Sequence, residues 1–247
     1  MSNSHKIVLP ILLTLTLIII SSSLSFAEVQ AVSAINANMG ISGGTVDSDS
    51  SSVFFMSTSI PVPDGVGIQF DTLGSDQDDI DISGFGTQLF RRDPEFGFFG
   101  IKTSYLKTEP TEFFIAGLQG GLYKGMSTLS WEIGGQWGDI DSDVYTRLNA
   151  RYYFSDNFSV ELGVGHASDE TYGRAAIEWQ APPLPNKFMG LSLFMDASGG
   201  NHTGQILAGF KIYFGESKSL IRRHREDNLP NTLKDSLSGI SRYKKRL

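Results

Sequence analysis

The sequence predicts an all-β fold: a transmembrane, up-and-down antiparallel β-barrel of about twelve strands, within a range of about ten to fourteen. Three observations lead to this prediction. Apolar and polar side chains alternate over segments of about ten residues, as in strands with two different faces. The chain holds 27 Gly and 17 Phe residues but no Cys. After residue 27, no apolar run approaches the roughly 20 residues of a spanning helix, so a membrane crossing would require strands.

Residues 1–27 have the features of a secretory signal peptide. Lys6 precedes an apolar run at residues 7–20, and Ala27 ends a small-residue cleavage site. A membrane anchor is the alternative, but a run of 14 residues is short for a crossing. We therefore expect the mature chain to be exported and to begin near residue 28.

The alternation is clearest in residues 144–165, on both sides of the Ser-Asp-Asn turn at 155–157. One face of each strand carries large apolar side chains, and the other carries small or charged ones. Twelve segments of this kind lie near 31–42, 52–60, 66–73, 80–90, 96–106, 113–123, 126–137, 144–154, 158–167, 172–180, 188–197 and 204–214.

The alternation alone does not decide whether the apolar faces point to lipid or fill the core of a soluble exported barrel or sandwich. Gly, Ser, Asn and Gln dominate the polar faces, which suits a lumen. The apolar faces often end in aromatic residues such as Trp137, Phe154 and Trp179, where membrane barrels carry their aromatic girdles. We therefore predict a membrane barrel.

The segments 150–165 and 208–214 resemble Gram-negative outer-membrane β-barrel proteins of the porin-like superfamily. Gly209, Ile212 and Phe214 are similar to the closing-strand signal that the barrel assembly machinery reads. The sequence departs from that signal at Leu207, where a polar residue is usual, and in the 33 residues that follow Phe214. The resemblance implies a barrel over residues 28–215, a location in the cell outer membrane, and contacts with outer-membrane lipid, lipopolysaccharide and the assembly machinery.

Charge is distributed unevenly along the chain. Residues 28–215 hold 23 acidic and 10 basic residues, and 13 of these acids fall in connections that share one rim of an up-and-down barrel. They include Asp76, Asp78, Asp79, Asp139, Asp141 and Asp143. We expect this rim to be extracellular, to attract cationic solutes or divalent cations, or to bridge lipopolysaccharide phosphates through divalent ions. The Asp139–Asp143 triplet lacks the Gly and Glu of a calcium loop, so it predicts a solvated turn and not a metal site.

Nine charged residues have the parity of the lumen face: Lys102, Glu132, Arg147, Arg151, Glu161, Arg174, Glu178, Asp196 and Lys211. One interpretation is that they form cross-strand ion pairs that fill a narrow lumen. The other is that they form a charged constriction that selects permeating solutes. A barrel of about twelve strands lies between filled barrels and open pores, so both interpretations stay open.

The sequence favours a non-enzymatic protein, either a narrow porin-like channel or a structural barrel, without a cofactor. A net charge of −7 argues against binding to nucleic acid. The alternative is a lipid-modifying hydrolase, because His166 and Ser168 are similar to the His-x-Ser arrangement of outer-membrane phospholipase A and the lipid A 3-O-deacylase. The residue that would orient the His has no clear candidate beyond the loop residues Asp169 and Glu170. An adhesin is a third option, but the acidic loops are short.

Residues 216–247 hold 9 basic and 4 acidic residues and are predicted to form a separate, periplasmic C-terminal tail. Leu233, Leu237 and Ile240 recur at helical spacing. A short amphipathic helix on the membrane surface or a partner contact would explain this pattern. A frayed polar terminus is the favoured interpretation.

Overall fold

The computed structural model describes residues 30–46, 49–77, 80–108, 111–139, 142–167, 170–182, 189–201, 204–231 and 233–234. The expected signal peptide lies outside these residues. Within the described ranges, no helix is both long and apolar enough to cross a membrane.

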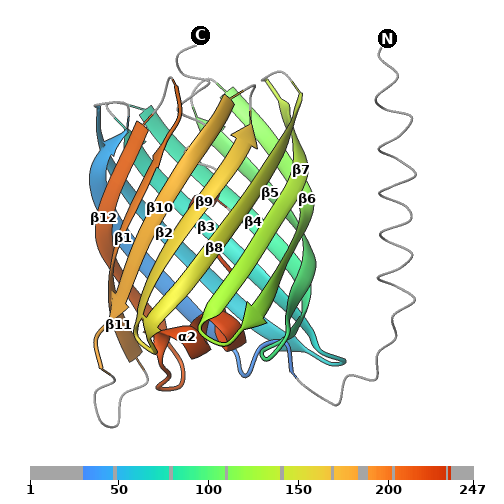
Figure 1. Cartoon of the computed structure of the whole chain (residues 1–247). Helices are drawn as coiled ribbons and strands as arrows, with labels where there is room; N and C mark the ends of the chain where they lie inside the picture. The colour runs from blue at the N-terminus through green and yellow to red at the C-terminus, as the bar shows by residue number, and fades with distance from the viewer. Residues whose placement is uncertain are drawn as a thin grey trace.

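The chain forms one closed antiparallel barrel, in which every strand pairs with its neighbours in sequence (Figure 1). The strands are β1 (Asn36–Val46), β2 (Asp49–Val62), β3 (Val66–Gln77), β4 (Ile80–Asp93), β5 (Gly97–Thr108), β6 (Thr111–Lys124), β7 (Ser127–Gly138), β8 (Asp143–Ser155), β9 (Phe158–Ala167), β10 (Glu170–Gln180), β11 (Met189–Gly199) and β12 (Gly204–Phe214). The barrel closes where β1 pairs with β12, with Ala37 opposite Phe214. The predicted twelve-strand up-and-down barrel is confirmed.

The two ends of the barrel differ in their connections. We call the end with the β2–β3, β4–β5, β6–β7, β8–β9 and β10–β11 connections the short-turn rim, and the opposite end the acidic rim. Asp64 and Gly65 both have positive φ angles, of 64° and 70°, and make the tight turn between β2 and β3. β1 begins and β12 ends at the short-turn rim, as the even strand number predicted.

Apolar side chains cover the outside of the barrel and polar ones the inside. Leu148 and Trp179 on the outer face are 46% and 45% exposed, whereas the inward-pointing Gln69 and Gln88 are fully buried. This is the orientation expected of a lipid-facing barrel, because the lipid around it favours apolar side chains. The closed sheet also leaves no unpaired strand edge in contact with the lipid.

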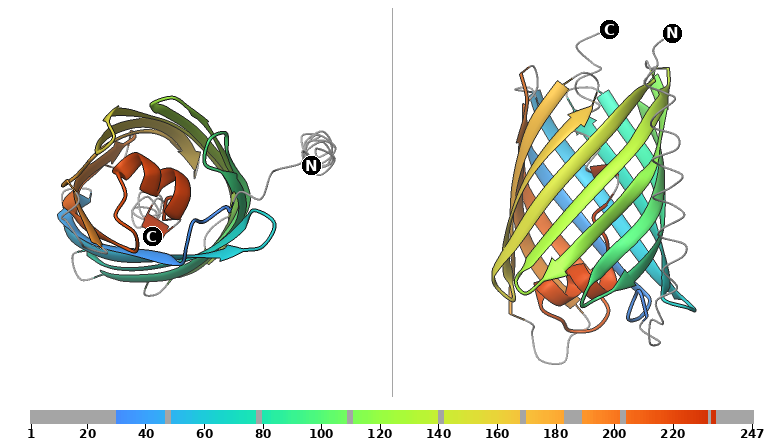
Figure 2. Two further views of the ribbon diagram at one scale, coloured as in Figure 1. Left: turned by 90° about the horizontal axis from the view of Figure 1, so that it is seen from below. Right: turned by 45° about the vertical axis from the view of Figure 1, so that its right-hand side comes forward.

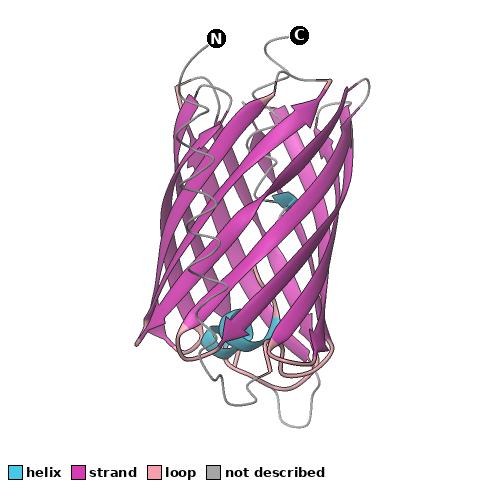
Figure 3. Ribbon diagram, turned by 90° about the vertical axis from the view of Figure 1, so that its right-hand side faces the viewer, coloured by secondary structure: helices cyan, strands magenta, loops and turns pink. Residues whose placement is uncertain are grey.

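The chain continues past β12 into the barrel and not away from it. After Gly215, the helical segments α2 (Leu220–Arg222) and η1 (Arg223–Asp227) lie inside the short-turn rim (Figure 2). A second helical piece, at residues 233–234, lies higher in the lumen (Figure 3). We call residues 216–234 the C-terminal segment.

The position of the C-terminal segment differs from the tail expected at residues 216–247. Its described part is neither frayed nor laid on a membrane surface, because Leu220 and Leu233 are fully buried in the lumen. Helical spacing of leucines does not distinguish a lipid surface from the inside of the same chain's barrel. Leu237 and Ile240 lie outside the described residues.

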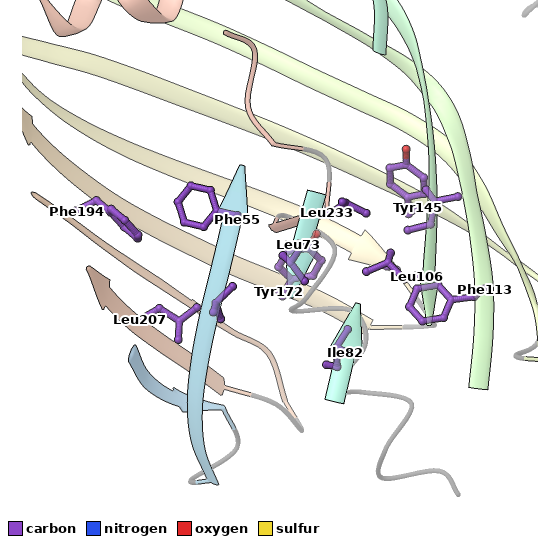
Figure 4. Packing of buried hydrophobic residues seen from close by; sticks show 13 residues of the cluster. Phe55, Leu73, Ile82, Leu106, Phe113, Tyr145, Tyr172, Phe194, Leu207 and Leu233 are labelled. Carbon is purple, nitrogen blue, oxygen red and sulfur yellow. The ribbon is translucent and has the colours of Figure 1, made fainter. Parts of the chain in front are cut away.

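A cluster of apolar side chains points into the lumen near the acidic-rim ends of the strands (Figure 4). The cluster, which we call the apolar ring, comprises Val53, Phe55, Leu73, Ile82, Leu106, Phe113, Ile115, Tyr145, Ala167, Tyr172, Phe194 and Leu207, with Leu233 of the C-terminal segment packed among them. The lumen therefore has an apolar layer toward the acidic rim and a charged layer below it.

Candidate functional site in the barrel lumen

All nine predicted lumen charges lie inside the barrel and take part in ion pairs. The first group joins β5, β7 and β8. Glu132 Oε2 lies 2.5 Å from Lys102 Nζ and 3.1 Å from Arg147 Nη1. Glu132 and Arg147 are direct cross-strand partners, so the sheet register itself sets up this contact.

A second group runs across four successive strands, β8 to β11. Arg151 Nη2 lies 2.6 Å from Glu161 Oε2, and Arg174 Nη1 lies 3.1 Å from Glu161 Oε1. Arg174 also binds Asp196, with its Nη2 atom 2.6 Å from Oδ2. The charges alternate in sign along the wall, so each is neutralised by its neighbours.

A third group connects the wall to the C-terminal segment. Glu178 accepts hydrogen bonds from Lys211 Nζ at 3.1 Å and from the Tyr213 hydroxyl at 2.7 Å. His224 of η1 places its Nε2 atom 3.4 Å from Glu178 and its Nδ1 atom 2.6 Å from Arg151 Nη1. The interpretation of the lumen charges as cross-strand pairs therefore describes this wall.

The opposite wall, formed by β2, β3 and β4, binds the C-terminal segment through amides and carbonyls. Gln69 accepts a hydrogen bond from the Leu229 backbone N–H at 2.8 Å and donates one to the Leu229 carbonyl at 3.1 Å. Gln88 donates to the Pro230 carbonyl at 2.9 Å. Asn228 donates to Ser59 Oγ at 2.9 Å. These residues were not predicted as binding residues, because amides on a lumen face carry no pattern that separates a binding role from a filling one.

A buried ionic cluster ties the residues just before β1 and those after β12 to the short-turn rim. Asp227 Oδ1 accepts hydrogen bonds from Lys218 Nζ at 2.6 Å and from Ser33 Oγ at 3.0 Å. Arg92 of β4 donates to the Ala31 carbonyl at 2.6 Å and to the Asp227 carbonyl at 2.7 Å. We call these residues the rim latch.

A small cavity remains beside the C-terminal segment. Its volume is about 110 Å³, and its lining includes Tyr153, Glu161, Arg174, Phe194 and Lys211. This is room for a few water molecules and well below the several hundred cubic ångströms of a typical ligand site. This cavity is therefore too small to hold a typical ligand.

Solved structures place this architecture among known membrane barrels. No family model and no curated protein matches the chain. The KdgM porin in complex with disordered oligogalacturonate is similar over 72% of this chain and 99% of its own, with a TM-score of 0.56 and 8% identity. The fold is that of an outer-membrane porin. An outer membrane channel from Pseudomonas putida F1 covers 78% of this chain and 98% of its own, with a TM-score of 0.51 and 12% identity. The NanC porin covers 72% and 100%, with a TM-score of 0.52 and 8% identity.

The acidic residues singled out from the sequence lie at the acidic rim where they are described. Asp76 and Asp139 are exposed and Asp143 is half-buried, while Asp78, Asp79 and Asp141 lie outside the described residues. Asp139 Oδ2 accepts the backbone N–H of Glu112 at 2.9 Å and so helps to shape the turn. Among the described residues, no group of three or more His, Asp and Glu side chains could hold a metal ion.

The enzyme alternative gains no support from the geometry. His166 is exposed at the acidic-rim end of β9, on the outward face that its parity predicted, and Ser168 lies outside the described residues. His166 Nδ1 lies 3.2 Å from the Thr171 hydroxyl. This contact is with a hydroxyl, whereas the His of a hydrolytic triad is oriented by a carboxylate or an amide.

Proposed function

We propose that this chain is a non-enzymatic, porin-like channel of the outer membrane that passes small polar solutes through a narrow lumen. One observation carries the proposal: a closed barrel has an apolar outside and a charged inside. The apolar outside would be unfavourable in water, and a lumen lined with charges of both signs offers polar solutes a path that an apolar lumen would not.

The alternating charges of the second group suit a route for hydrated polar solutes. A wall with both signs offers each solute group a partner without binding it tightly, and conduction needs weak, repeated sites of this kind. The similar fold of solved outer-membrane channels supports the proposal.

The orientation and selectivity are part of the proposal. With the short-turn rim periplasmic, the acidic rim faces the outside, where lipopolysaccharide and divalent cations are the expected contacts. Exposed carboxylates such as Asp76 and Asp81 would raise the local concentration of cations at the mouth.

The test is electrical recording of the purified full-length protein in a planar lipid bilayer with a salt gradient. We expect discrete, brief conductance steps and a reversal potential that indicates cation preference. Replacement of both Asp76 and Asp81 by Asn should reduce that preference without changing the barrel. Recordings with no defined steps, at any voltage and in every variant below, would overturn the channel function.

A further inference from the structure

We propose that the C-terminal segment is a removable stopper, which closes the channel from within and must withdraw before solutes pass. This inference rests on the proposed channel function. It concerns residues 216–234, which enter the lumen at the short-turn rim and extend upward to the apolar ring.

The stopper is held at three levels of the barrel. The rim latch holds its base, where Lys218 and Asp227 are almost fully buried. In the charged layer, His224 contacts Arg151 and Glu178. The third level is the apolar ring, which surrounds Leu233. Because the three levels use different strands, the segment spans the width of the lumen as well as part of its height.

The tip of the stopper lies in the apolar ring. Leu233 is fully buried in the apolar ring, and Figure 4 shows it among Phe55, Leu73 and Leu106. Lys234 lies 3.4 Å from Asp196 and 4.1 Å from the centre of the Phe194 ring. An apolar constriction with a leucine in its middle excludes water, and ions cannot cross a layer without water.

The barrel wall leaves room for this segment at two glycines. A Cβ atom added at Gly84 would lie 3.0 Å from Leu233 Cδ2, with the Tyr105 carbonyl and Leu106 of the wall as near, at 3.0 and 3.1 Å. A Cβ atom added at Gly190 would meet three atoms of the Arg223 guanidinium group at 2.9, 3.1 and 3.2 Å, and these are its nearest neighbours. The lumen face is therefore shaped to the stopper, which argues against a chance position of the chain end.

The contacts also suit withdrawal, because the charges of the β8–β12 wall keep partners without the stopper. Arg151 keeps Glu161, Arg174 keeps Asp196, and Lys211 keeps Glu178 when the segment leaves. Removing one member of a buried ion pair is costly, and these pairs avoid that loss. The main contacts given up are neutral hydrogen bonds from Gln69 and Gln88 and the bond from Arg92 to the Asp227 carbonyl, and Arg92 keeps the Ala31 carbonyl. The segment itself buries few apolar side chains, with Leu220, Leu229 and Leu233 as its leucines, so its release costs far less than unfolding a strand.

The release variant is Gly190→Val. The valine side chain would push against the Arg223 guanidinium group, and the three nearest atoms to its Cβ all belong to the stopper. Arg223 is 1% exposed and its guanidinium lies 5.0 Å from the centre of the Tyr213 ring, so it has little free space into which to turn. Gly173→Val, on the outer face of the neighbouring strand β10, is the control for adding a valine to this wall, because an added Cβ there has nothing within 4 Å. Both changes place a β-branched residue in a strand of the same wall, where such residues are well tolerated.

The locking variant uses the absence of native cysteines. Asn231 Nδ2 lies 3.1 Å from Ser57 Oγ, so the two side chains point toward each other and Ser57→Cys with Asn231→Cys is the pair chosen for cross-linking. Oxidation would fasten the stopper to β2, and dithiothreitol would free it. The single Asn231→Cys variant controls for the loss of the amide.

Two measurements on the full-length protein decide the matter. In planar bilayers, Gly190→Val should raise the open time by roughly tenfold or more, the change expected when one good contact is lost. Oxidation of the two cysteines added to Gly190→Val should abolish that increase, and reduction should restore it. In a separate variant, Leu233→Cys should react with a bulky maleimide roughly tenfold faster when Gly190→Val is also present.

The outcomes separate this inference from the channel function. If conductance steps are seen but their open time changes neither with Gly190→Val nor with the disulfide, the stopper inference is wrong and the channel function still holds. A maleimide rate that rises with Gly190→Val while no variant conducts would overturn the channel, and with it the gating role. An equal maleimide rate in both backgrounds would show that the segment does not leave the lumen.

Discussion

The ammonium group of Lys218 lies 2.6 Å from Oδ1 of Asp227, and the exposed fractions of the two side chains are 2% and 4%. Asp227 belongs to η1 and Lys218 to the turn before α2, so this contact folds the base of the C-terminal segment back on itself. Ser33 binds the same carboxylate oxygen at 3.0 Å. The residues that precede β1 and those that follow β12 are thus held together by one buried carboxylate.

Asp227→Asn should weaken the rim latch. The change leaves the buried Lys218 without its nearest anion, although Glu226, at 3.2 Å, compensates in part. Because breaking a buried ion pair costs several kcal/mol, we expect a loss of about 1–3 kcal/mol in the docking of the segment. Faster maleimide labelling of Leu233→Cys is the measurement. Arg222→Gln removes an exposed pair with Glu226 and is the control, with an expected effect below about 0.5 kcal/mol.

Acid should release the stopper through His224. Burial and the nearby Arg151 lower the pKa of His224 to about 4. The ring contacts Arg151 and Tyr153 of β8, Glu178 of β10 and Tyr213 of β12, with Lys211 of β12 also nearby. A group whose pKa is lower when docked binds its proton more tightly when released. Docking is therefore lost as the pH falls from about 6.5 to 4, by roughly 3 kcal/mol in all.

The measurement is open time or Leu233→Cys labelling between pH 7.5 and 4. His224→Phe should remove most of the dependence above pH 5, since phenylalanine has no proton to gain. Glu226 is bound by Arg222 and Lys218, and these two cations lower the pKa of its carboxyl group. A second weakening of docking, below about pH 4.5, should therefore persist in both proteins. A flat profile for the native chain over this range would contradict the assignment.

Glu132→Gln should destabilise the barrel itself. Glu132 is shared by Lys102 and Arg147, and its replacement leaves two buried cations facing a neutral amide. We expect the free energy of unfolding to fall by about 3–5 kcal/mol. The measurement is the temperature at which the protein changes from the gel migration of the folded barrel to that of the unfolded chain, which should be lower for the variant. Glu112→Gln, in an exposed pair with Lys107, should change this temperature little. Recovery on combining Glu132→Gln with Lys102→Met would confirm that the unpaired charge is the cause.

Leu148→Arg should impair membrane insertion. Leu148 lies midway along β8, opposite Val164, and is 46% exposed on the outer face. Arginine at the centre of a barrel's lipid face costs about 2–4 kcal/mol, whereas near the rim it costs about 0–1. Folding into lipid vesicles across a urea series measures the difference. Asp81→Arg at the acidic rim is the control, and equal midpoints for the two variants would show that this face does not meet lipid.

Ser168→Ala separates the channel from the lipid-modifying hydrolase. If His166 and Ser168 do not form a catalytic pair, the variant and the native protein should release fatty acid from phospholipid and lipid A at the same background rate. Mass spectrometry of the lipid fraction measures this. A deacylation activity that the native protein shows and the variant lacks would favour the enzyme.

The strands and their faces were predictable because both follow from a period of two along the chain. The face to which a side chain such as Leu148 points can be inferred from the residues two positions before and after it, which lie on the same face. The lumen charges were found for the same reason, and the register then paired Glu132 with Arg147. Strand faces and the pairing of successive strands depend on residues close in the sequence, so an alternating pattern can predict them.

The contents of the lumen were not predictable in this way. The apolar ring joins residues from many strands, and only the closed barrel brings Phe55 and Phe194 to a centroid distance of 5.8 Å. Gly190 gave no sign that Arg223 would lie against it. The basic composition of the chain end was visible, but its partners were the lumen walls, which exist only once twelve strands are in register.

The closure of β1 on β12 has a consequence for the order of folding. Before Ala37 meets Phe214, the surfaces that receive residues 216–234 lie on an open, curving sheet with an unpaired edge at each side. The segment contacts both the β2–β4 wall and the β8–β12 wall, so its full set of contacts exists only after the seam has formed. A Leu233→Cys thiol in a partly assembled barrel should therefore stay reactive until the seam closes. The time at which the thiol stops reacting with maleimide would then mark the closure of the barrel.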